Sequence, residues 1–430
     1  MIKVGLVSLG CAKNLIDSEM ILAMFSADEY KLTDNPAEAD LLIVNTCGFI
    51  EEAKEEAIDT ILNMAQYPGK LCVVGCFVER NLEELKKSIP EVDLWVPLKD
   101  YPHIHEKIEA LLGTKDLRPI NPLHRVVSTP DYAAYLRISE GCNNFCAFCA
   151  IPYIRGHFVS RPYDEILLEA ETLKKAGVKE ISLVSQDTTM YGFDFPSHKP
   201  NIIDLLKALD AMGFYSIRLL YLYPDEISDE LLLTVKDSRS IKHYFDIPIQ
   251  CASDHLLKLM KRHGTAEQEK ELFLKIKTLM PEAVLRTTLI AGFPGESEED
   301  QKETLSFLKE IQFDHLGVFP YSREEGTAAY SYPHQVPKAT KLKRHDEIMD
   351  FQRKISHTRN ESHIGEVMEG LVTGYDKEKN YYTLRSYWNA PDDIDGNLYF
   401  SSQIPLKMGQ IVRVKITSCF IYDLLGERVD

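Results

Sequence analysis

The sequence has no run of apolar residues long enough to cross a lipid bilayer, and its first residues do not resemble a secretion signal. The start, Met1 to Val7, predicts a β-strand instead. Because disulfides persist mainly in oxidising compartments, nine cysteines without such a signal are more typical of metal binding or of chemistry in a reducing cytoplasm. We therefore expect a cytoplasmic protein that does not span a membrane.

Basic residues are outnumbered by acidic residues in this chain. It has 49 Lys and Arg against 66 Asp and Glu, which gives a formal net charge of −17. Generic nucleic-acid binding needs clustered positive charge, so this balance argues against it. An acidic surface suits a basic protein partner, or it serves only solubility, and the sequence leaves both interpretations open.

Several familiar catalytic arrangements are missing as well. No serine–histidine–acid pattern and no glycine-rich phosphate loop stands out, and there is no internal repeat or low-complexity tract. The 430 residues, of which 44% are hydrophobic and 27% charged, are enough for two or three globular domains. The cysteines remain as the main chemical feature.

Three cysteines stand close together in the string C-N-N-F-C-A-F-C, directly after a strand-like run at 135–139: Cys142, Cys146 and Cys149. Three thiolates at this spacing can ligate three corners of a [4Fe–4S] cluster and leave the fourth iron open for chemistry. The alternative is a structural zinc site, but zinc needs four ligands at a different spacing, and the nearest histidine is His157. The spacing therefore favours an iron–sulfur cluster.

The first part of the chain alternates strand and helix patterns. Three apolar runs of strand length enclose two helical patterns, in the order 3–9, 15–25, 41–46, 51–64 and 71–75. Strands separated by helices predict a parallel sheet in an α/β domain, which we place at residues 1–125. Three prolines between Pro119 and Pro130 indicate a linker at its end.

The second part repeats a strand followed by a helix. Its strand candidates are 135–139, 180–184, 216–222, 244–249, 284–290 and 315–319. Helical patterns follow them, for example at 164–175, 202–212 and 298–311, and a long charged helix at 340–359 ends the segment. Six βα units predict an incomplete βα barrel over residues 131–361, with its active site at the carboxyl ends of the strands. The clustered cysteines follow the first of these strands, where such a site would lie.

The last part, residues 364–430, is rich in Val, Ile, Tyr and Thr, with Gly, Asn and Asp at expected turns. Residues 410–417 alternate apolar and polar positions, as a half-exposed strand does. This pattern predicts a small antiparallel β-barrel similar to an OB fold. The whole chain is thus expected to be α/β, ending in a β-barrel domain.

Three further cysteines follow the predicted strands of the first domain, and each has a glycine beside it. They are Cys11, Cys47 and Cys76, with Gly10, Gly48 and Gly75. The carboxyl ends of parallel strands meet at one edge of a sheet, so these distant cysteines are expected to converge. The glycines would let the backbone approach a bulky second cluster. The alternative is that they are ordinary small buried residues, as we expect Cys72 and Cys419 to be.

Together these features resemble the radical S-adenosylmethionine (SAM) enzymes, and among them the methylthiotransferases, over essentially the whole chain. We call Cys142, Cys146 and Cys149 the radical set, and Cys11, Cys47 and Cys76 the auxiliary set. The family implies that a [4Fe–4S] cluster on the radical set cleaves SAM to a radical, and that a second [4Fe–4S] cluster on the auxiliary set handles the inserted sulfur. It also implies a terminal TRAM domain that helps to hold the substrate. The hard step belongs to the cofactors, so no side chain is assigned as a catalytic residue.

The resemblance also suggests contacts to SAM. Phe148, the aromatic residue before the last cysteine of the radical set, fits the family, and its alternative is an ordinary core aromatic. The Gly-Gly-Glu string of the wider superfamily is absent after the second barrel strand, and Gln186 stands there as the candidate for binding the SAM amino group. Gly292 begins a turn that is expected to face the cofactor. The alternative is a simple loop that leads to Ser297 as a helix cap.

Two branches of the family differ in substrate. One modifies an isopentenylated adenosine in transfer RNA. The other, RimO, modifies the β-carbon of an aspartate in ribosomal protein number twelve of the small subunit. Strings resembling the RimO branch occur at 7–14, 45–50, 185–189 and 390–396. As a departure, Cys251 stands where RimO-like chains usually have histidine, so a thiol is expected near the barrel mouth.

The charge of the terminal barrel favours the RimO branch. From Ile364 onward it has seven Lys and Arg against ten Asp and Glu, so its sum is 7 − 10 = −3, which suits a basic ribosomal protein better than RNA. Expected partners are that protein or the assembled ribosome, an electron donor such as flavodoxin, and a sulfide or polysulfide sulfur source; membranes and transfer RNA are not expected. The alternatives are methylthiolation of transfer RNA and a non-catalytic iron–sulfur carrier or assembly scaffold.

Overall fold

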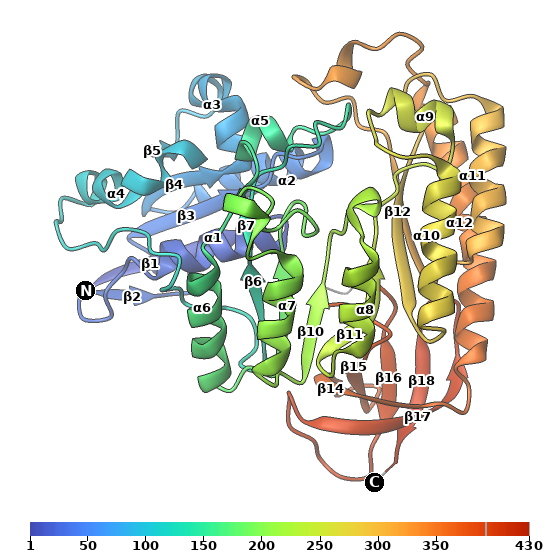
Figure 1. The fold of residues 1–430 in the computed structure, drawn as a ribbon. Helices are drawn as coiled ribbons and strands as arrows, with labels where there is room; N and C mark the ends of the chain where they lie inside the picture. Colours follow the sequence, from blue (N-terminus) through green and yellow to red (C-terminus); the bar gives the residue numbers. More distant parts are fainter. Residues whose placement is uncertain (392–393, 430) are drawn as a thin grey trace.

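The computed structural model of the protein describes residues 1–391 and 394–429. Two parallel sheets with flanking helices are followed by a small β-barrel (Figure 1). Asp392, Asp393 and Asp430 lie outside the described residues, and the first two belong to the string 390–396. No helix that the structure describes is both long and apolar enough to cross a membrane.

The N-terminal domain is a parallel sheet with the strand order β2-β1-β3-β4-β5. Its elements are β1 (Ile2–Ser8), α1 (Ala12–Leu22), β2 (Tyr30–Leu32), β3 (Leu41–Thr46), α2 (Glu51–Met64), β4 (Lys70–Gly75), α3 (Cys76–Ser88), β5 (Leu94–Val96) and α4 (Ile104–Leu112). The three predicted strands and two predicted helices are confirmed. The central strand β3 is buried along its whole length, which explains its apolar run. The strands β2 and β5 have three residues each, too few for a pattern of their own.

The central strands of this domain end at one level. Ser8 of β1 pairs with Asn45 of β3, and Thr46 pairs with Gly75 of β4. The residues that follow these strands, which include the auxiliary set, therefore leave the sheet at the same edge.

The central domain is an open parallel sheet with the order β13-β12-β11-β10-β9-β6. Its strands are β6 (Ala133–Arg137), β9 (Glu180–Val184), β10 (Ser216–Leu219), β11 (Ile241–Asp246), β12 (Val284–Ala291) and β13 (His315–Pro320). Its helices are α6 (Tyr163–Lys175), α7 (Ile202–Ala211), α8 (Asp229–Asp237), α9 (Asp254–Leu259), α10 (Ala266–Leu279), α11 (Glu298–Ile311) and α12 (Lys338–Ser362). The six predicted strands are confirmed. β10 ends before Leu222 because Tyr221 has a φ of +60°, which a strand cannot accommodate.

The C-terminal domain is a closed barrel with the order β14-β15-β16-β18-β17. Its strands are β14 (Val367–Asp376), β15 (Tyr381–Arg385), β16 (Leu398–Ser401), β17 (Ile411–Cys419) and β18 (Leu424–Arg428). The predicted barrel is confirmed. Its pairs are antiparallel except β16 with β18, which run parallel.

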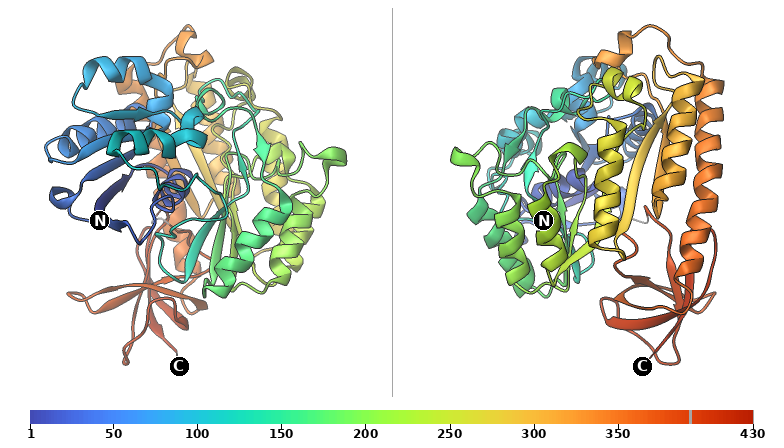
Figure 2. Two further views of the ribbon diagram at one scale, coloured as in Figure 1. Left: turned by 90° about the vertical axis from the view of Figure 1, so that its left-hand side faces the viewer. Right: turned by 45° about the vertical axis from the view of Figure 1, so that its right-hand side comes forward.

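The barrel packs at the end of the central sheet opposite α9 (Figures 1 and 2). Lys179, just before β9, donates a hydrogen bond to the carbonyl of Gly409 at 2.7 Å, and His315 at the start of β13 contacts the carbonyl of Trp388 at 2.8 Å. These contacts lie at the amino ends of the strands. The C-terminal β-barrel therefore covers the amino-terminal end of the central sheet, which is the end remote from the clustered cysteines.

The segment between the first two domains is anchored by buried charges. Arg125 donates to Glu19 of α1 at 2.5 Å and to Glu169 of α6 at 2.8 Å, and all three side chains are buried. One hydrophobic cluster also draws on all three domains, and its members include Ala12, Ile16, Met20, Val184, Leu220 and Trp388. The predicted linker is thus a fixed part of the interface that sets the N-terminal domain against the central sheet.

Candidate functional site

All six predicted cluster cysteines line one cavity of about 330 Å³. The cavity lies where the loops after β1, β3 and β4 meet the loops after β6, β9 and β10. A larger and more open hollow of about 590 Å³ beside α9, α10 and α11 contains neither set. The fold thus brings the two cysteine sets together from two domains.

The radical set lies on the loop between β7 (Ser139–Glu140) and α5 (Ile151–Arg155). Gly141 allows the turn, because its φ is +76° and a side chain there would collide with the carbonyl of His157. Burial raises the pKa of Cys142 to about 11 and also raises that of Cys149. The thiols of Cys142 and Cys149 therefore stay protonated near neutral pH unless a metal displaces the proton.

The auxiliary set is assembled from three strand ends, and glycines make room for it. A Cβ atom at Gly10 would lie 2.7 Å from the Cβ of Cys47, and one at Gly48 would lie 2.6 Å from the Cα of Phe77. Gly10 also has a φ of +86°. The strand ends therefore pack closely against each other at these glycines, while the approach of the backbone to a cluster stays a prediction.

Two asparagines that the sequence reasoning missed hold these strand ends together. The Asn14 amide donates to the carbonyls of Leu9 at 3.0 Å and of Thr46 at 3.1 Å. The Asn45 amide donates to the carbonyl of Asn14 at 2.8 Å. Each of these asparagines lies within three residues of a cysteine of the auxiliary set, and that proximity was the available signal.

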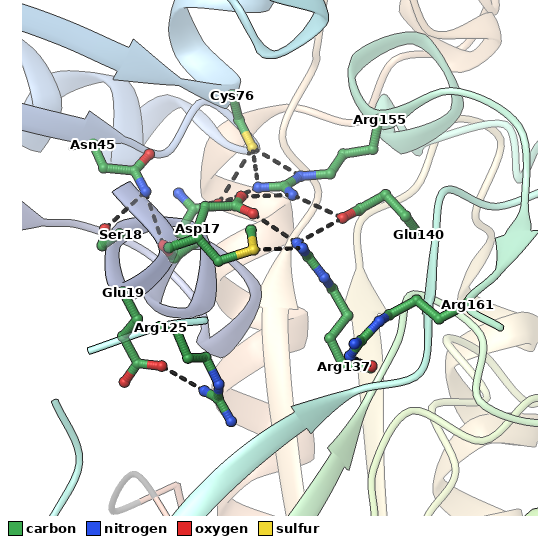
Figure 3. Close-up of polar contacts among 12 residues, drawn as sticks. Asp17, Ser18, Glu19, Asn45, Cys76, Arg125, Arg137, Glu140, Arg155 and Arg161 are labelled. Carbon is green, nitrogen blue, oxygen red and sulfur yellow. Dashed lines mark hydrogen bonds and ion pairs between the residues drawn. The ribbon is translucent and has the colours of Figure 1, made fainter. Parts of the chain in front are cut away.

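An arginine from the central domain contacts the auxiliary set (Figure 3). The Arg155 guanidinium lies 3.2 and 3.3 Å from the sulfur of Cys76 and donates to Asn14 at 2.6 Å. Its remaining nitrogen pairs with Asp17 of α1 at 2.8 Å. Burial raises the pKa of the Cys76 thiol to about 12, and the guanidinium opposes that shift. A fixed positive charge thus lies beside one sulfur of the set.

Arg155 belongs to a buried network of charges that joins the two domains (Figure 3). Arg137 donates to Asp17 at 2.6 Å and to Glu140 at 3.0 Å, and Glu140 also pairs with Arg155 at 3.3 Å. Glu140 accepts a further hydrogen bond from Gln186 at 2.6 Å. A continuous chain of contacts therefore runs from Cys76 to the second strand of the central sheet.

The donor set fits two iron–sulfur clusters better than it fits zinc. Among the described residues, no three His, Cys, Asp or Glu side chains lie close enough together to hold a single metal ion. Zinc would need four ligands with zinc–sulfur bonds of about 2.3 Å. Each set of three cysteines instead borders a shared cavity, as a larger group with one open corner requires.

Two of the three predicted SAM contacts line this cavity. Phe148 and Gln186 do so, and the Gln186 Oε1 atom is buried without a hydrogen-bond partner among the described residues. Gly292 is not among the described residues that line it. Its N–H donates to the Glu296 carboxylate, and a side chain there would collide with Lys341 of α12. The structure thus gives Gly292 a packing role, and its predicted contact with SAM stays unsupported.

The remaining cysteines are not among the described residues that line the cavity, although Cys251 follows the lining residue Gln250. The thiol expected near the barrel mouth, that of Cys251, is enclosed: it is 2% exposed, and burial raises its pKa. Cys72 is buried in β4, and Cys419 is partly buried at the end of β17. Both fit the structural roles expected of them.

Other residues to which the sequence reasoning gave no role also line the cavity, although two of them, Lys13 and Asn144, lie inside the strings that it singled out. They include Lys13, Asn144, Tyr221, Tyr223 and Arg262. Burial lowers the pKa of Lys13, whose ammonium lies 3.3 Å from the centre of the Tyr221 ring. Arg262 lies over the ring of Tyr223 at 4.1 Å. Two aromatic rings on the loop after β10 thus each lie against a cation of the cavity lining.

Comparisons with known proteins first define the class. Residues 3–97 match the model of the uncharacterized protein family UPF0004, residues 136–308 match the radical SAM superfamily, and residues 364–429 match the TRAM domain. Among solved structures, the radical SAM methyltransferase TsrM from Kitasatospora setae aligns with a TM-score of 0.55 at 12% identity, over 75% of each chain. The cobalamin-dependent SAM radical enzyme OxsB aligns with a TM-score of 0.53 at 14% identity, over 82% of this chain and 56% of OxsB. The fold is that of a radical SAM enzyme.

The curated relatives then give the particular family. The ribosomal protein uS12 methylthiotransferase RimO of Acetivibrio thermocellus is 44% identical over 100% of this chain and 98% of its own length. The enzyme of the same name from Aquifex aeolicus is 46% identical over 99% of this chain and 96% of its own. The chain belongs to the RimO family of radical SAM methylthiotransferases.

Proposed function

We propose that this protein transfers a methylthio group to the β-carbon of an aspartate in ribosomal protein uS12, with two [4Fe–4S] clusters and two molecules of SAM. The observation that carries the proposal is that both cysteine sets border one cavity. Hydrogen removal and sulfur delivery must reach the same carbon, so the two centres have to face a common space. The curated relatives are named as enzymes that act on uS12.

The residues around the cavity would have different roles, according to where they lie. The radical set would hold one cluster and the auxiliary set the other, while the bound groups supply the radical, the sulfur and the methyl group. The unpartnered Gln186 Oε1 atom would accept a hydrogen bond from the SAM amino group, and Phe148 would enclose the cofactor on the same side. Arg155 would donate a hydrogen bond to the Cys76 sulfur that ligates the cluster, and so hold that side chain in place.

The acidic surface supports a basic protein as the partner. The net charge of −17 would attract uS12, either free or on the ribosome, in the cytoplasm. The terminal barrel packs away from the cavity, so its charge of −3 would act on the approach of the partner rather than on the reacting atoms. These charges and the relatives' names favour uS12 over transfer RNA. An electron donor such as flavodoxin and a sulfide or polysulfide source would complete the reaction.

Three units would share these tasks: residues 1–125 for the auxiliary cluster, 131–361 for the radical chemistry and 364–430 for the TRAM domain. The three matched family models fall inside these bounds.

The test compares uS12 and transfer RNA from a deletion strain by mass spectrometry. The proposal predicts that uS12 loses the mass of one methylthio group while transfer RNA is unchanged. Loss of the modification from transfer RNA, with uS12 intact, would contradict it. Protein purified without oxygen should also contain about eight irons per chain.

A further inference from the structure

Lys13 is a nearly buried ammonium that faces the cavity. It lies two residues after Cys11 on the first turn of α1, is 7% exposed, and lines the cavity together with both cysteine sets. Its Nζ atom contacts the face of Tyr221, 3.3 Å from the ring centre. The side chain therefore points from the N-terminal domain toward the loop that follows β10.

No carboxylate of the described residues forms an ion pair with Lys13. The group that acts most strongly to favour its charge is the thiol of Cys11, followed by the carboxylates of Glu140 and Asp246. Glu140 is bound by Arg137 and Arg155, and Asp246 accepts from Arg286 at 2.7 Å. The nearby acids are thus already matched with arginines.

The cavity itself is lined by no Asp or Glu among the described residues. Its other cations have partners: Arg155 binds Asp17 and Glu140, and Arg262 donates to the carbonyl of Pro248 at 2.7 Å and interacts with the buried Glu269. Among the cations of the lining that the structure describes, Lys13 alone contacts neither a carboxylate nor a carbonyl, and the Cys11 thiol is the anionic group that acts on it most strongly. A buried charge of this kind is costly unless a counter-ion meets it, and the N-terminal end of α1 adds to the attraction for an anion.

We propose that the Lys13 ammonium binds the carboxylate of the substrate aspartate. This inference rests on the proposed function, because it takes the substrate to be an aspartate side chain. Lys13 belongs to the domain of the auxiliary set, beside Cys11, so a carboxylate held there would present its neighbouring β-carbon to the side of the cavity where sulfur is supplied. SAM also carries a carboxylate, and the test separates the two sources.

The experiment measures binding of purified uS12 to the anaerobically reconstituted protein, in the wild type and in Lys13→Met, which keeps the length of the side chain but removes its charge. Each is tested with natural uS12 and with uS12 carrying asparagine at the modified aspartate. Lys13→Met should weaken binding of natural uS12 at least about tenfold. The asparagine form should bind the wild type and Lys13→Met equally, because it offers no carboxylate.

Three controls keep the result specific. Lys31→Met removes the same charge from the exposed edge strand β2 and should change binding of uS12 by less than about twofold. Iron content is measured for each variant, and loss of iron from Lys13→Met would overturn the inference by making the residue a support for the cluster. The affinity for SAM is measured in parallel, and a loss confined to SAM would assign Lys13 to the cofactor and overturn it too.

Two further outcomes are decisive. Equal weakening of the aspartate and asparagine forms, or no weakening of either, would overturn the role of Lys13 while leaving the proposed function intact. A wild-type protein that neither binds nor modifies uS12 would overturn the proposed function and the inference with it.

Discussion

The two cysteine sets differ in how the chain builds them. The radical set occupies eight residues of one loop, so its spacing is written directly in the sequence. The auxiliary set is spread from Cys11 to Cys76 and exists only when β1, β3 and β4 pair in parallel with their ends at one level. One site is thus encoded locally, whereas the other is a product of the fold.

The two sets also differ in which domains hold them in place. The loop of the radical set is held within the central domain: the N–H of Cys149 donates to the carbonyl of Cys146, that of Ala147 donates to the carbonyl of Met260, and Gly141 makes a turn. The auxiliary set depends on the other domain, because Arg155 reaches across the interface to Cys76. The auxiliary site should therefore be the more sensitive to changes at the domain interface.

The largest expected effect is from Cys142→Ala. Removing one of three ligands should release the radical cluster, so cleavage of SAM and methylthiolation of uS12 are both abolished and iron falls from about eight to about four per chain. Cleavage is followed as release of 5′-deoxyadenosine. Cys419→Ala, in the terminal barrel, is the matched control and should keep full iron. A Cys142→Ala protein that still cleaves SAM would show that this set does not hold the reactive cluster.

The second variant, Cys47→Ala, should separate the two sites. Methylthiolation of uS12 should stop because the auxiliary cluster is lost, while SAM is still cleaved at the radical set, and iron again falls to about four. The ratio of 5′-deoxyadenosine to methylthiolated uS12 measures this uncoupling. If Cys47→Ala leaves both reactions intact, the auxiliary assignment is wrong.

The cysteines changed in these two variants belong to the part of the site that the sequence could predict. The strands, the barrel and the placement of all six cysteines followed from spacing and from the rule that parallel strands end at one edge. The contacts of Arg155 with Cys76 could not be predicted, because they depend on how two domains pack. The packing of Gly292 against the helix α12 could not be predicted either, because a glycine turn has the same signature whether it meets a cofactor or a helix, and its contact with SAM stays a prediction.

Substitutions of Arg155 should affect the auxiliary site although they replace none of its three cysteine ligands. Arg155→Leu takes a partner away from the buried Asp17, so we expect a loss of about 3–5 kcal/mol in the free energy of unfolding and a reduced iron content. Arg155→Lys keeps the charge and should lose less of both. Chemical denaturation and iron analysis measure the two effects. An Arg155→Leu protein with wild-type stability and full iron would contradict the importance of this contact.

A smaller effect is expected at the domain linker. Arg125→Leu removes the shared partner of Glu19 and Glu169, which should cost about 3 kcal/mol of stability and leave both cysteine sets in place. The exposed pair of Lys70 with Asp93 is the comparison, and Lys70→Ala should cost less than about 1 kcal/mol. Equal losses in the two variants would show that the linker is not anchored as described.

The most direct test of a shared cavity is the electron paramagnetic resonance spectrum of the reduced, reconstituted protein. Two clusters facing one space of this size should couple magnetically, so the wild-type spectrum should differ from the sum of the spectra of two triple alanine variants, one lacking each cysteine set. A wild-type spectrum equal to that sum, from protein with about eight irons per chain, would place the clusters apart and contradict the account.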